Sequence, residues 1–318
     1  MNGTKNYLQV FDRPAHSFDL SEEQEQLLPN DQDIEFFREH GWFVTQKVLS
    51  DELIDRIFVA TEELYAGNKD AEIPIPGCSN WKYGDDTPVR NNEYISFQKK
   101  AFWQISLSPV IGAIAGKLMN TDTVRYFQDQ LVSKEPSVNH HETRSTNVGW
   151  HTDRSYHSNC TSDKILTAWI PLHDVDCSHG SLVMVDGSHK WSQTDHIRGF
   201  NHENHAEIEQ DFLRQGKQFQ KVPLVLKKGQ ISFHNSSIIH GSFQNRSKIM
   251  RRALVLNLQD GDNRHQPYWN NGKQINHFLD SFCRQQANGL PDYTDPAIFP
   301  VVWSKNVPCK NKKLPISL

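Results

Sequence analysis

The chain has 318 residues, of which 36% are hydrophobic and 23% charged, which is ordinary globular usage and enough to bury a sizeable core. The formal net charge is −4 and the sequence has no long basic run, so nucleic acid and membrane surfaces are poor partners for it. No apolar run approaches the ~20 residues that a membrane span needs. The five cysteines include no CxxC spacing, which fits a reducing compartment. We therefore expect a soluble, cytoplasmic protein.

Helical patterns dominate the first third of the chain. Apolar side chains recur there at helical spacing, and the residues that flank these runs are typical caps and stops. A stretch dense in Gly, Pro, Asn and Asp marks a long loop. The expected elements are a short helix that begins near Asp31 and stops at Gly41, a strand over residues 42–44, a helix capped by Ser50 and Asp51, a loop over residues 67–92 and a helix over about residues 102–118.

The pattern changes after residue 123, where short apolar runs alternate with turn residues. Many short strands with glycine-rich turns are typical of a double-sheet jelly roll. The polar stretch over residues 191–220 lacks this rhythm, so we expect an inserted loop or helix over the mouth of the barrel. A last helix is expected at about residues 274–286. The expected strands are 124–133, 165–172, 181–185, 222–226, 230–234, 237–242 and 253–258.

These elements predict a mostly β fold with flanking helices and a double-stranded β-helix core, the jelly roll that cupins also use. We expect one domain. In this division residues 1–123 are an N-terminal helical elaboration, residues 124–260 are the jelly-roll core with its insertion at about 191–220, and residues 261–318 are a C-terminal extension.

A His-x-Asp motif, His151-Thr152-Asp153, is the first candidate for chemistry. On a strand, residues i and i+2 point to the same face, so this imidazole and this carboxylate can converge on one metal ion. Two protein ligands do not make a selective site. Fe(II) oxygenases use two histidines and one carboxylate and leave the other positions open, so a second histidine must come from elsewhere in the chain.

His240 is the best candidate for that second histidine. It lies in a predicted strand that ends at Gly241, and the 87 residues that separate it from Asp153 (240 − 153) suit a jelly roll that closes through several strands. His234 is a rival. Its even spacing from His240 would place both on one face of a continuous strand, but residues 235–237 are typical of a turn.

Arg251 is the candidate anchor for a dicarboxylate, because a guanidinium can bind a carboxylate through two parallel hydrogen bonds. Its neighbour Arg252 is the alternative. We favour Arg251, since its face of the predicted strand is small and mixed like a pocket, whereas the face of Arg252 is all leucine. Arg251 shares its face with Ala253, Val255 and Asn257, and Arg252 shares the other with Leu254, Leu256 and Leu258.

The ordered set of motifs resembles the phytanoyl-CoA dioxygenase-like family of Fe(II)/2-oxoglutarate-dependent oxygenases. One His-x-Asp alone is a weak signal, but several motifs in one order and spacing are specific. They cover roughly residues 128–258. The motifs are Trp150-His151-Thr152-Asp153, Trp169-Ile170-Pro171-Leu172, Gly187-Ser188-His189-Lys190, and His240-Gly241-Ser242 followed by Asn245 and Arg251.

The resemblance implies a role for each matching residue. His151, Asp153 and His240 would be the iron ligands, and the co-substrate 2-oxoglutarate and O2 would complete the set of cofactors. Family halogenases replace the carboxylate ligand with a small residue, so Asp153 argues against halogenation. The implied co-substrate contacts are Arg251 at the distal carboxylate, Ser242 beside it, and Trp169 and Gln130 in the same pocket. Lys134 follows the predicted strand that carries Gln130, and we favour a surface charge for it over a substrate contact.

The implied activity is that of a 2-oxoglutarate-dependent dioxygenase. Iron and 2-oxoglutarate would supply the oxidant for an unactivated C–H bond, with succinate and carbon dioxide as the products of the co-substrate. We expect hydroxylation of a small organic metabolite in specialised metabolism, with oxidative cyclisation or desaturation of an amino-acid-derived metabolite as the alternative. A non-catalytic, ligand-binding jelly roll is the alternative of another class. Cupin isomerases and metal hydrolases fit less well, because cupins usually carry His-x-His with Glu and a further His.

Overall fold

The computed structural model describes residues 17–73, 81–137, 145–200 and 205–305. Its helices are α1 (Glu22–Gln26), α2 (Asp31–His40), α3 (Asp51–Tyr65), α4 (Ile95–Gln98), α5 (Trp103–Ser106), α6 (Pro109–Met119) and α7 (His205–Arg214), with 3₁₀ turns that include η4 (Asp153–Tyr156) and η7 (Phe278–Ser281). Its strands are β1 (Trp42–Val44), β2 (Val89–Glu93), β3 (Thr123–Lys134), β4 (Val148–His151), β5 (Ile165–Pro171), β6 (Leu182–Val185), β7 (Lys221–Pro223), β8 (Ser232–Asn235), β9 (His240–Ser242), β10 (Arg251–Asp260), β11 (Tyr268–Asn270), β12 (Lys273–Ile275) and β13 (Val301–Ser304).

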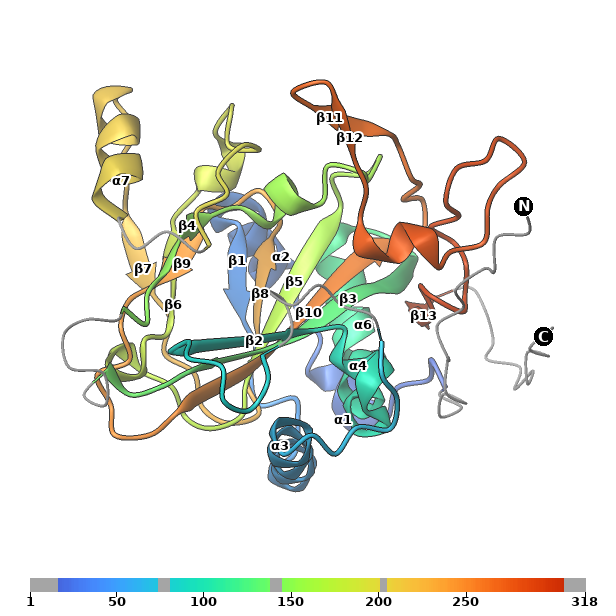
Figure 1. Ribbon diagram of the computed structural model, residues 1–318, viewed down its shortest axis with the longest axis horizontal. Coiled ribbons are helices and arrows are strands. Elements are labelled where there is room, and N and C mark those ends of the chain that lie inside the picture. The colour runs from blue at the N-terminus through green and yellow to red at the C-terminus, as the bar shows by residue number, and fades with distance from the viewer. Residues whose placement is uncertain (1–16, 74–80, 138–144, 201–204, 306–318) are drawn as a thin grey trace.

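Strands β3 to β10 build the core as two sheets (Figure 1). The large sheet has seven strands in the order β1-β8-β5-β10-β3-β13, with β2 also paired to β3. The small sheet has four strands in the order β4-β9-β6-β7. The pairs are antiparallel in both sheets. Because the chain passes back and forth between the two sheets, the core is a jelly roll, and the predicted fold class is confirmed.

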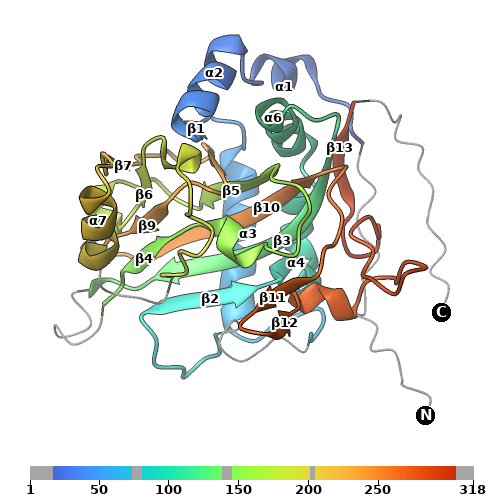
Figure 2. The same ribbon diagram turned by 90° about the horizontal axis from the view of Figure 1, so that it is seen from above.

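Strands from outside residues 124–260 complete the large sheet. β1 pairs with β8, while β2 and β13 pair with β3 (Figure 2). The loop predicted over residues 67–92 is therefore wrong at its end, since Val89 begins a strand; its residues 74–80 lie outside the described part of the chain. The sequence of β2 is Val-Arg-Asn-Asn-Glu and four of its five residues are only half-buried, so it carries no apolar signal. The division of the chain into one domain with two elaborations stays a prediction.

The predicted caps place the N-terminal helices correctly. Gly41 ends α2 in the left-handed conformation with φ 82°, which only glycine adopts without cost. The side chain of Ser50 accepts the N–H of Leu53 at the start of α3. The helix predicted over 102–118 is broken into α5 and α6, because Pro109 disfavours helical geometry in Ser108 before it. In the part of the chain that the structure describes, no helix is both long and apolar enough to cross a membrane.

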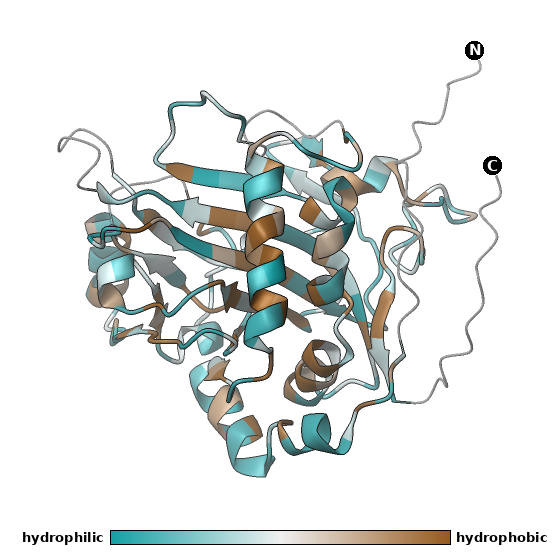
Figure 3. Ribbon diagram, turned by 90° about the horizontal axis from the view of Figure 1, so that it is seen from below, coloured by the Kyte–Doolittle hydropathy of each residue, from teal (hydrophilic) through white to brown (hydrophobic). Residues whose placement is uncertain are grey.

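The two faces of β10 have different surroundings, as predicted: one packs against helices and the other faces the space between the two sheets. Figure 3 shows α3 lying across the outer face, where its buried side chains include Ile54 and Ile57. The leucines of β10 pack on that side with the helices, whereas Ala253 packs between the two sheets. The face of β10 that carries Arg251 is therefore the inner face, and the face that carries Arg252 meets α3.

One prediction for the later part of the chain is wrong, and another holds for only part of its segment. Residues 274–286 form no α-helix: β11 and β12 make a hairpin around Asn271 and Gly272, which both have positive φ, and an Asn-Gly pair is the strongest short-range signal for such a turn. The insertion does contain a helix, α7, but Glu209 on it accepts the indole N–H of Trp150 at 3.1 Å. Trp150 points away from the sheet interior, so α7 covers the outer face of the small sheet. Phe200, earlier in the insertion, does lie beside His151.

One irregularity in the small sheet matters for the site. Val148 pairs with Ser242 and His151 pairs with His240, so β4 has one residue more than β9 between these two pairs. Such a bulge re-aims the side chains that follow it. Since alternate residues of a strand face opposite sides, a regular ladder would turn His151 to the outer face. Gly241 lies opposite the bulge and leaves it room.

We predict that Gly241→Ala weakens both folding and metal binding. An added Cβ would meet the carbonyl oxygen of Val148 at 2.8 Å and Cε3 of Trp150 at 3.0 Å, so β4 and β9 must move apart. Overpacking of this kind costs about 1–3 kcal/mol of unfolding free energy, measurable by denaturant titration.

Gly261→Ala is the matched control, because its Cβ would meet Cβ of Thr123 at 2.8 Å near the β3–β13 edge. Both variants should lose stability, but calorimetric titration with Mn(II) should show weaker binding for Gly241→Ala alone. Equal metal affinity in the two variants would contradict the role given to the bulge.

Candidate metal centre

Three side chains meet between the two sheets. His151 is the last residue of β4, His240 is the first of β9, and the two are cross-strand partners. Thr152 stays extended before η4, which keeps Asp153 on the same side as His151. The Nε2 atoms of His240 and His151 lie 3.6 and 3.9 Å from Oδ1 of Asp153, and the three potential ligand atoms all lie within 4.8 Å of one another. The structure thus brings together the three residues predicted as ligands.

Backbone carbonyls set the tautomers of both histidines. Nδ1 of His151 lies 2.8 Å from the carbonyl oxygen of Gly149, and Nδ1 of His240 lies 3.1 Å from that of Ile238. A carbonyl oxygen only accepts hydrogen bonds, so each Nδ1 carries the proton. Each Nε2 therefore turns a lone pair toward the shared space, which is how metal-binding histidines are usually oriented.

The protonation states also suit a divalent cation. Burial lowers the pKa of His151, and burial together with the neighbouring His151 lowers the pKa of His240 well below its usual value. Burial alone would raise the pKa of the Asp153 carboxyl, but the surrounding histidines, His240 first, hold it well below its usual range. Two neutral imidazoles and one carboxylate result at neutral pH, and metal binding needs these deprotonated forms.

His234 lies close to the three but on another strand. Ser236 and Ser237 form the predicted turn, so β8 and β9 are separate strands in different sheets. Nε2 of His234 is 3.3 Å from Oδ2 of Asp153, the carboxylate oxygen that faces away from His151 and His240. Within the part of the chain that the structure describes, neither ring nitrogen of this buried side chain makes a hydrogen bond of good geometry. A third histidine therefore contacts the carboxylate of the cluster from the opposite sheet.

Two buried cations lie further along the inner face, at the start of β10. Arg251 and Lys134 are cross-strand partners. Nζ of Lys134 lies 2.9 Å from the carbonyl oxygen of Phe243 and also donates to the hydroxyl of Ser242. The guanidinium carbon of Arg251 lies 5.4 Å from the ring centre of Trp169. Among the described residues, no carboxylate pairs with either cation.

Lys134 corrects an expectation, because it is fully buried rather than on the surface. Its burial, with Arg251 nearby, lowers its pKa well below the usual value. Burial also lowers the pKa of Arg251 to about 10, which leaves the guanidinium charged at neutral pH. Buried charges without a partner are costly, so this end of the interior suits an anionic ligand. The sequence signal was the even spacing of Lys134 from Gln130, which places both on one strand face.

The other predicted co-substrate residues are Ser242, Trp169 and Gln130. Ser242 ends β9 beside Lys134, and Trp169 and Gln130 both pair with Val255 of β10 on the inner face. The side-chain amide of Gln130 is already engaged, since it donates to Oε1 of Glu93 at 3.1 Å.

Arg252 points to the outer face, where it pairs with Glu62 of α3 and lies over the ring of Phe58, 4.5 Å from its centre. Of the two neighbouring arginines, only Arg251 faces the interior.

Aromatic side chains near the cluster were not predicted. The ring of Phe200 lies 5.3 Å from that of His151, and the ring of Tyr156 lies 6.2 Å from it. Arg198 lies over Tyr156 and donates to the carbonyl oxygen of Ser155. Phe200 and Arg198 belong to the insertion that is predicted to lie over the barrel mouth, although its polar composition singled out neither residue.

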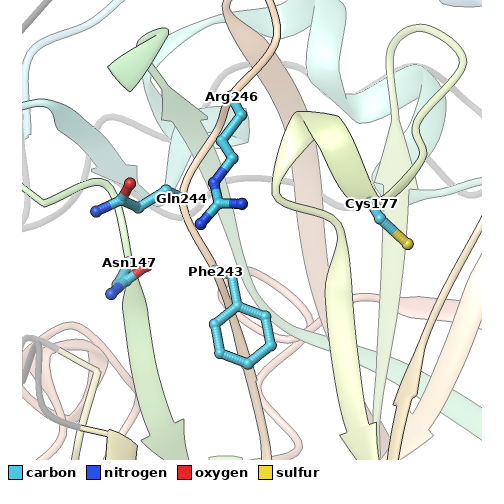
Figure 4. Close-up of a pocket in the computed structure, with 5 residues that line it drawn as sticks. All are labelled: Asn147, Cys177, Phe243, Gln244 and Arg246. Atoms are coloured by element: carbon cyan, nitrogen blue, oxygen red, sulfur yellow. The ribbon is translucent and has the colours of Figure 1, made fainter. Parts of the chain in front are cut away.

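A surface pocket next to the end of β9 is separate from the histidine cluster. Figure 4 shows Asn147, Cys177, Phe243, Gln244 and Arg246 around it. None of the predicted ligands or co-substrate residues lines it. The pocket therefore does not change the assignment of the candidate centre.

Comparisons with known proteins agree with this geometry. The sequence model of the family described as phytanoyl-CoA dioxygenase (PhyH) matches residues 37–253. The peroxisomal phytanoyl-CoA dioxygenase of Bos taurus is 23% identical over 244 residues, which span 71% of this chain and 67% of that protein.

Solved structures show the same fold at low sequence identity. The non-heme alpha-ketoglutarate-dependent carbocyclase SnoK from nogalamycin biosynthesis matches with a TM-score of 0.60 and 23% identity, over 79% of this chain and 95% of SnoK. EctD from S. alaskensis, solved with 2-oxoglutarate and 5-hydroxyectoine, matches with a TM-score of 0.63 and 18% identity, over 85% of this chain and 88% of EctD. The family model covers more than half of the chain, and the chain belongs to the phytanoyl-CoA dioxygenase family.

Proposed function

We propose that this chain is an Fe(II)- and 2-oxoglutarate-dependent oxygenase whose iron is held by His151, Asp153 and His240. The observation that carries the proposal is the convergence of two Nε2 lone pairs and one carboxylate oxygen within 4.8 Å. Two histidines and one carboxylate on one side of a metal leave the remaining positions free, which is the donor set of non-heme Fe(II) oxygenases. The predicted oxidoreductase class follows from this centre and from the family.

The buried cations support a site for the distal carboxylate of 2-oxoglutarate. Arg251 offers a planar pair of donors, and its guanidinium has no carboxylate partner among the described residues. Lys134 lies beside Arg251 and donates to the hydroxyl of Ser242, which can then donate its own proton to the bound carboxylate. We propose Trp169 as the wall of this site beside Arg251. Gln130 would contact the co-substrate only through the part of its amide that Glu93 leaves free.

The bound cofactors and the protein side chains have separate roles in this proposal. Iron and 2-oxoglutarate, when bound with O2, supply the oxidising chemistry, and the products include succinate and carbon dioxide. The protein keeps both imidazoles neutral and Asp153 ionised, anchors the far end of the keto acid at Arg251, and buries both ends away from water. Phe200 and Tyr156 flank His151 on the insertion side, where they are placed to contact a substrate.

We propose a small organic metabolite as substrate and hydroxylation of an unactivated C–H bond, in specialised metabolism, as the reaction. The structural similarity to SnoK, a carbocyclase, and to EctD, solved with 5-hydroxyectoine, supports small-molecule oxidation and keeps cyclisation or desaturation as the alternative. A cytoplasmic location and the absence of nucleic-acid partners stay predictions. A silent ligand-binding jelly roll would need no intact ligand set, which argues against the non-catalytic alternative.

His240→Ala should abolish both iron binding and turnover. Loss of one of three protein ligands should weaken Fe(II) binding by on the order of 100-fold or more, measured by anaerobic calorimetric titration. Succinate formation from 2-oxoglutarate and O2 should then vanish. Wild-type protein that binds Fe(II) and 2-oxoglutarate yet forms no succinate with any tested metabolite would favour the silent jelly roll, and an active His240→Ala variant would refute the ligand assignment.

Arg251→Ala should act on the co-substrate rather than on the metal. Losing a charge-assisted bidentate contact should raise the 2-oxoglutarate KM by about 10- to 100-fold, while Fe(II) affinity stays near the wild-type value. The neighbouring Arg252→Ala is the control: it removes the contacts with Glu62 and Phe58, so it should lower thermal stability and leave the 2-oxoglutarate KM unchanged. The reverse pattern would transfer the role to Arg252.

A further inference from the structure

The two oxygens of Asp153 have different surroundings. Oδ1 faces the small sheet, where it lies 3.6 Å from Nε2 of His240. Oδ2 faces the large sheet, where it accepts a hydrogen bond from the hydroxyl of Thr167 and lies 3.3 Å from Nε2 of His234. One oxygen is thus directed at the candidate metal position and the other is occupied by the protein.

The groups around Oδ2 form one row across the large sheet. Thr167 is the cross-strand partner of His234 on β8 and of Asn257 on β10, so all three side chains lie on the inner face. The side-chain amide of Asn257 donates to the Thr167 hydroxyl at 2.7 Å. Because this hydroxyl already accepts from Asn257, its own proton is directed to Oδ2. The direction of the Thr167 donor is therefore set by the strand register.

The contact with Asp153 is the polar contact that the structure shows for His234 among the described residues. Its side chain is buried, and both of its ring nitrogens lack a well-formed hydrogen bond, although buried polar atoms are nearly always paired. Its ring lies 4.5 Å from that of His240, and Oδ2 of Asp153 is the oxygen in reach of its Nε2. The neutral tautomer with a proton on Nε2 is sufficient to donate to Oδ2.

We propose that His234, Thr167 and Asn257 are positioning residues that hold Oδ2 of Asp153, so that this carboxylate binds iron through Oδ1 alone. The inference rests on the proposed role of Asp153 as a ligand and goes beyond it. A carboxylate that turned freely could take two metal positions with its two oxygens. Holding Oδ2 from the large sheet keeps one of these positions available for the keto acid or O2.

The test compares variants that remove or keep the donor to Oδ2. His234→Leu and Thr167→Val preserve the approximate shape of the side chain but lose the donor, so each should weaken Mn(II) binding about 10- to 100-fold in calorimetric titrations. His234→Gln keeps an N–H near the position of Nε2 and should stay within about threefold of wild type. The visible absorption of bound Co(II), which depends on the number and arrangement of its ligands, should change in the Leu variant and be restored in the Gln variant.

Ser232→Ala is the matched control, because Ser232 is buried on the same strand face as His234 but pairs with Trp169 and does not contact Asp153. It should bind Mn(II) like wild type. Unchanged Mn(II) affinity and an unchanged Co(II) spectrum in both His234→Leu and Thr167→Val would overturn the proposal. Asp153→Ala distinguishes the ligand role of Asp153 from the positioning role of its neighbours. Full metal affinity in that variant would overturn the ligand assignment. Loss of metal affinity in that variant, with unchanged affinity in the His234 and Thr167 variants, would overturn the positioning role alone.

Discussion

A one-residue offset between β4 and β9 is the constraint on which the candidate centre depends. His151 and His240 can share an ion because the extra residue in β4 turns His151 inward opposite His240. The same offset turns Trp150 to the outer face of the small sheet, where its indole N–H donates to Glu209 of α7. The helix of the insertion therefore covers the indole. Gly241 makes the offset possible, because any Cβ at this position would push against the bulged backbone. Local backbone geometry, rather than residue identity alone, thus sets up the metal-binding arrangement.

The two ends of the sheet interior are electrostatically opposite. At one end lies a single carboxylate, Asp153, whose pKa is held well below its usual range, beside two imidazoles whose pKa values are lowered by burial. At the other end lie Arg251 and Lys134 on neighbouring strands, and no carboxylate among the described residues pairs with either. A metal cation at the first end and a carboxylate at the second would each supply the missing charge. A keto acid bound to the metal at its near end would supply the carboxylate that Arg251 lacks at its far end.

The sequence is sufficient to predict features that depend on the alternation of side chains along a single strand and on local helix caps. The i, i+2 spacing of His151 and Asp153, the opposite faces of Arg251 and Arg252, and the glycine that ends α2 follow rules that need no partner strand. What it missed depends on partners distant in sequence. The bulge exists only in the pairing of β4 with β9, and the burial of Lys134 only in its contact with Ser242 and Phe243. The sequence suggests His234 as a rival ligand on one continuous strand with His240, whereas its contact with Asp153 comes from the opposite sheet.

An anomalous difference map from crystals grown with Mn(II) would test the central claim most directly, because it locates the metal without relying on activity. The account predicts one strong peak between Nε2 of His151, Nε2 of His240 and Oδ1 of Asp153, with Oδ2 still in contact with Thr167. A peak bonded to His234 in place of either histidine, or no peak among these side chains at full metal occupancy elsewhere, would contradict it.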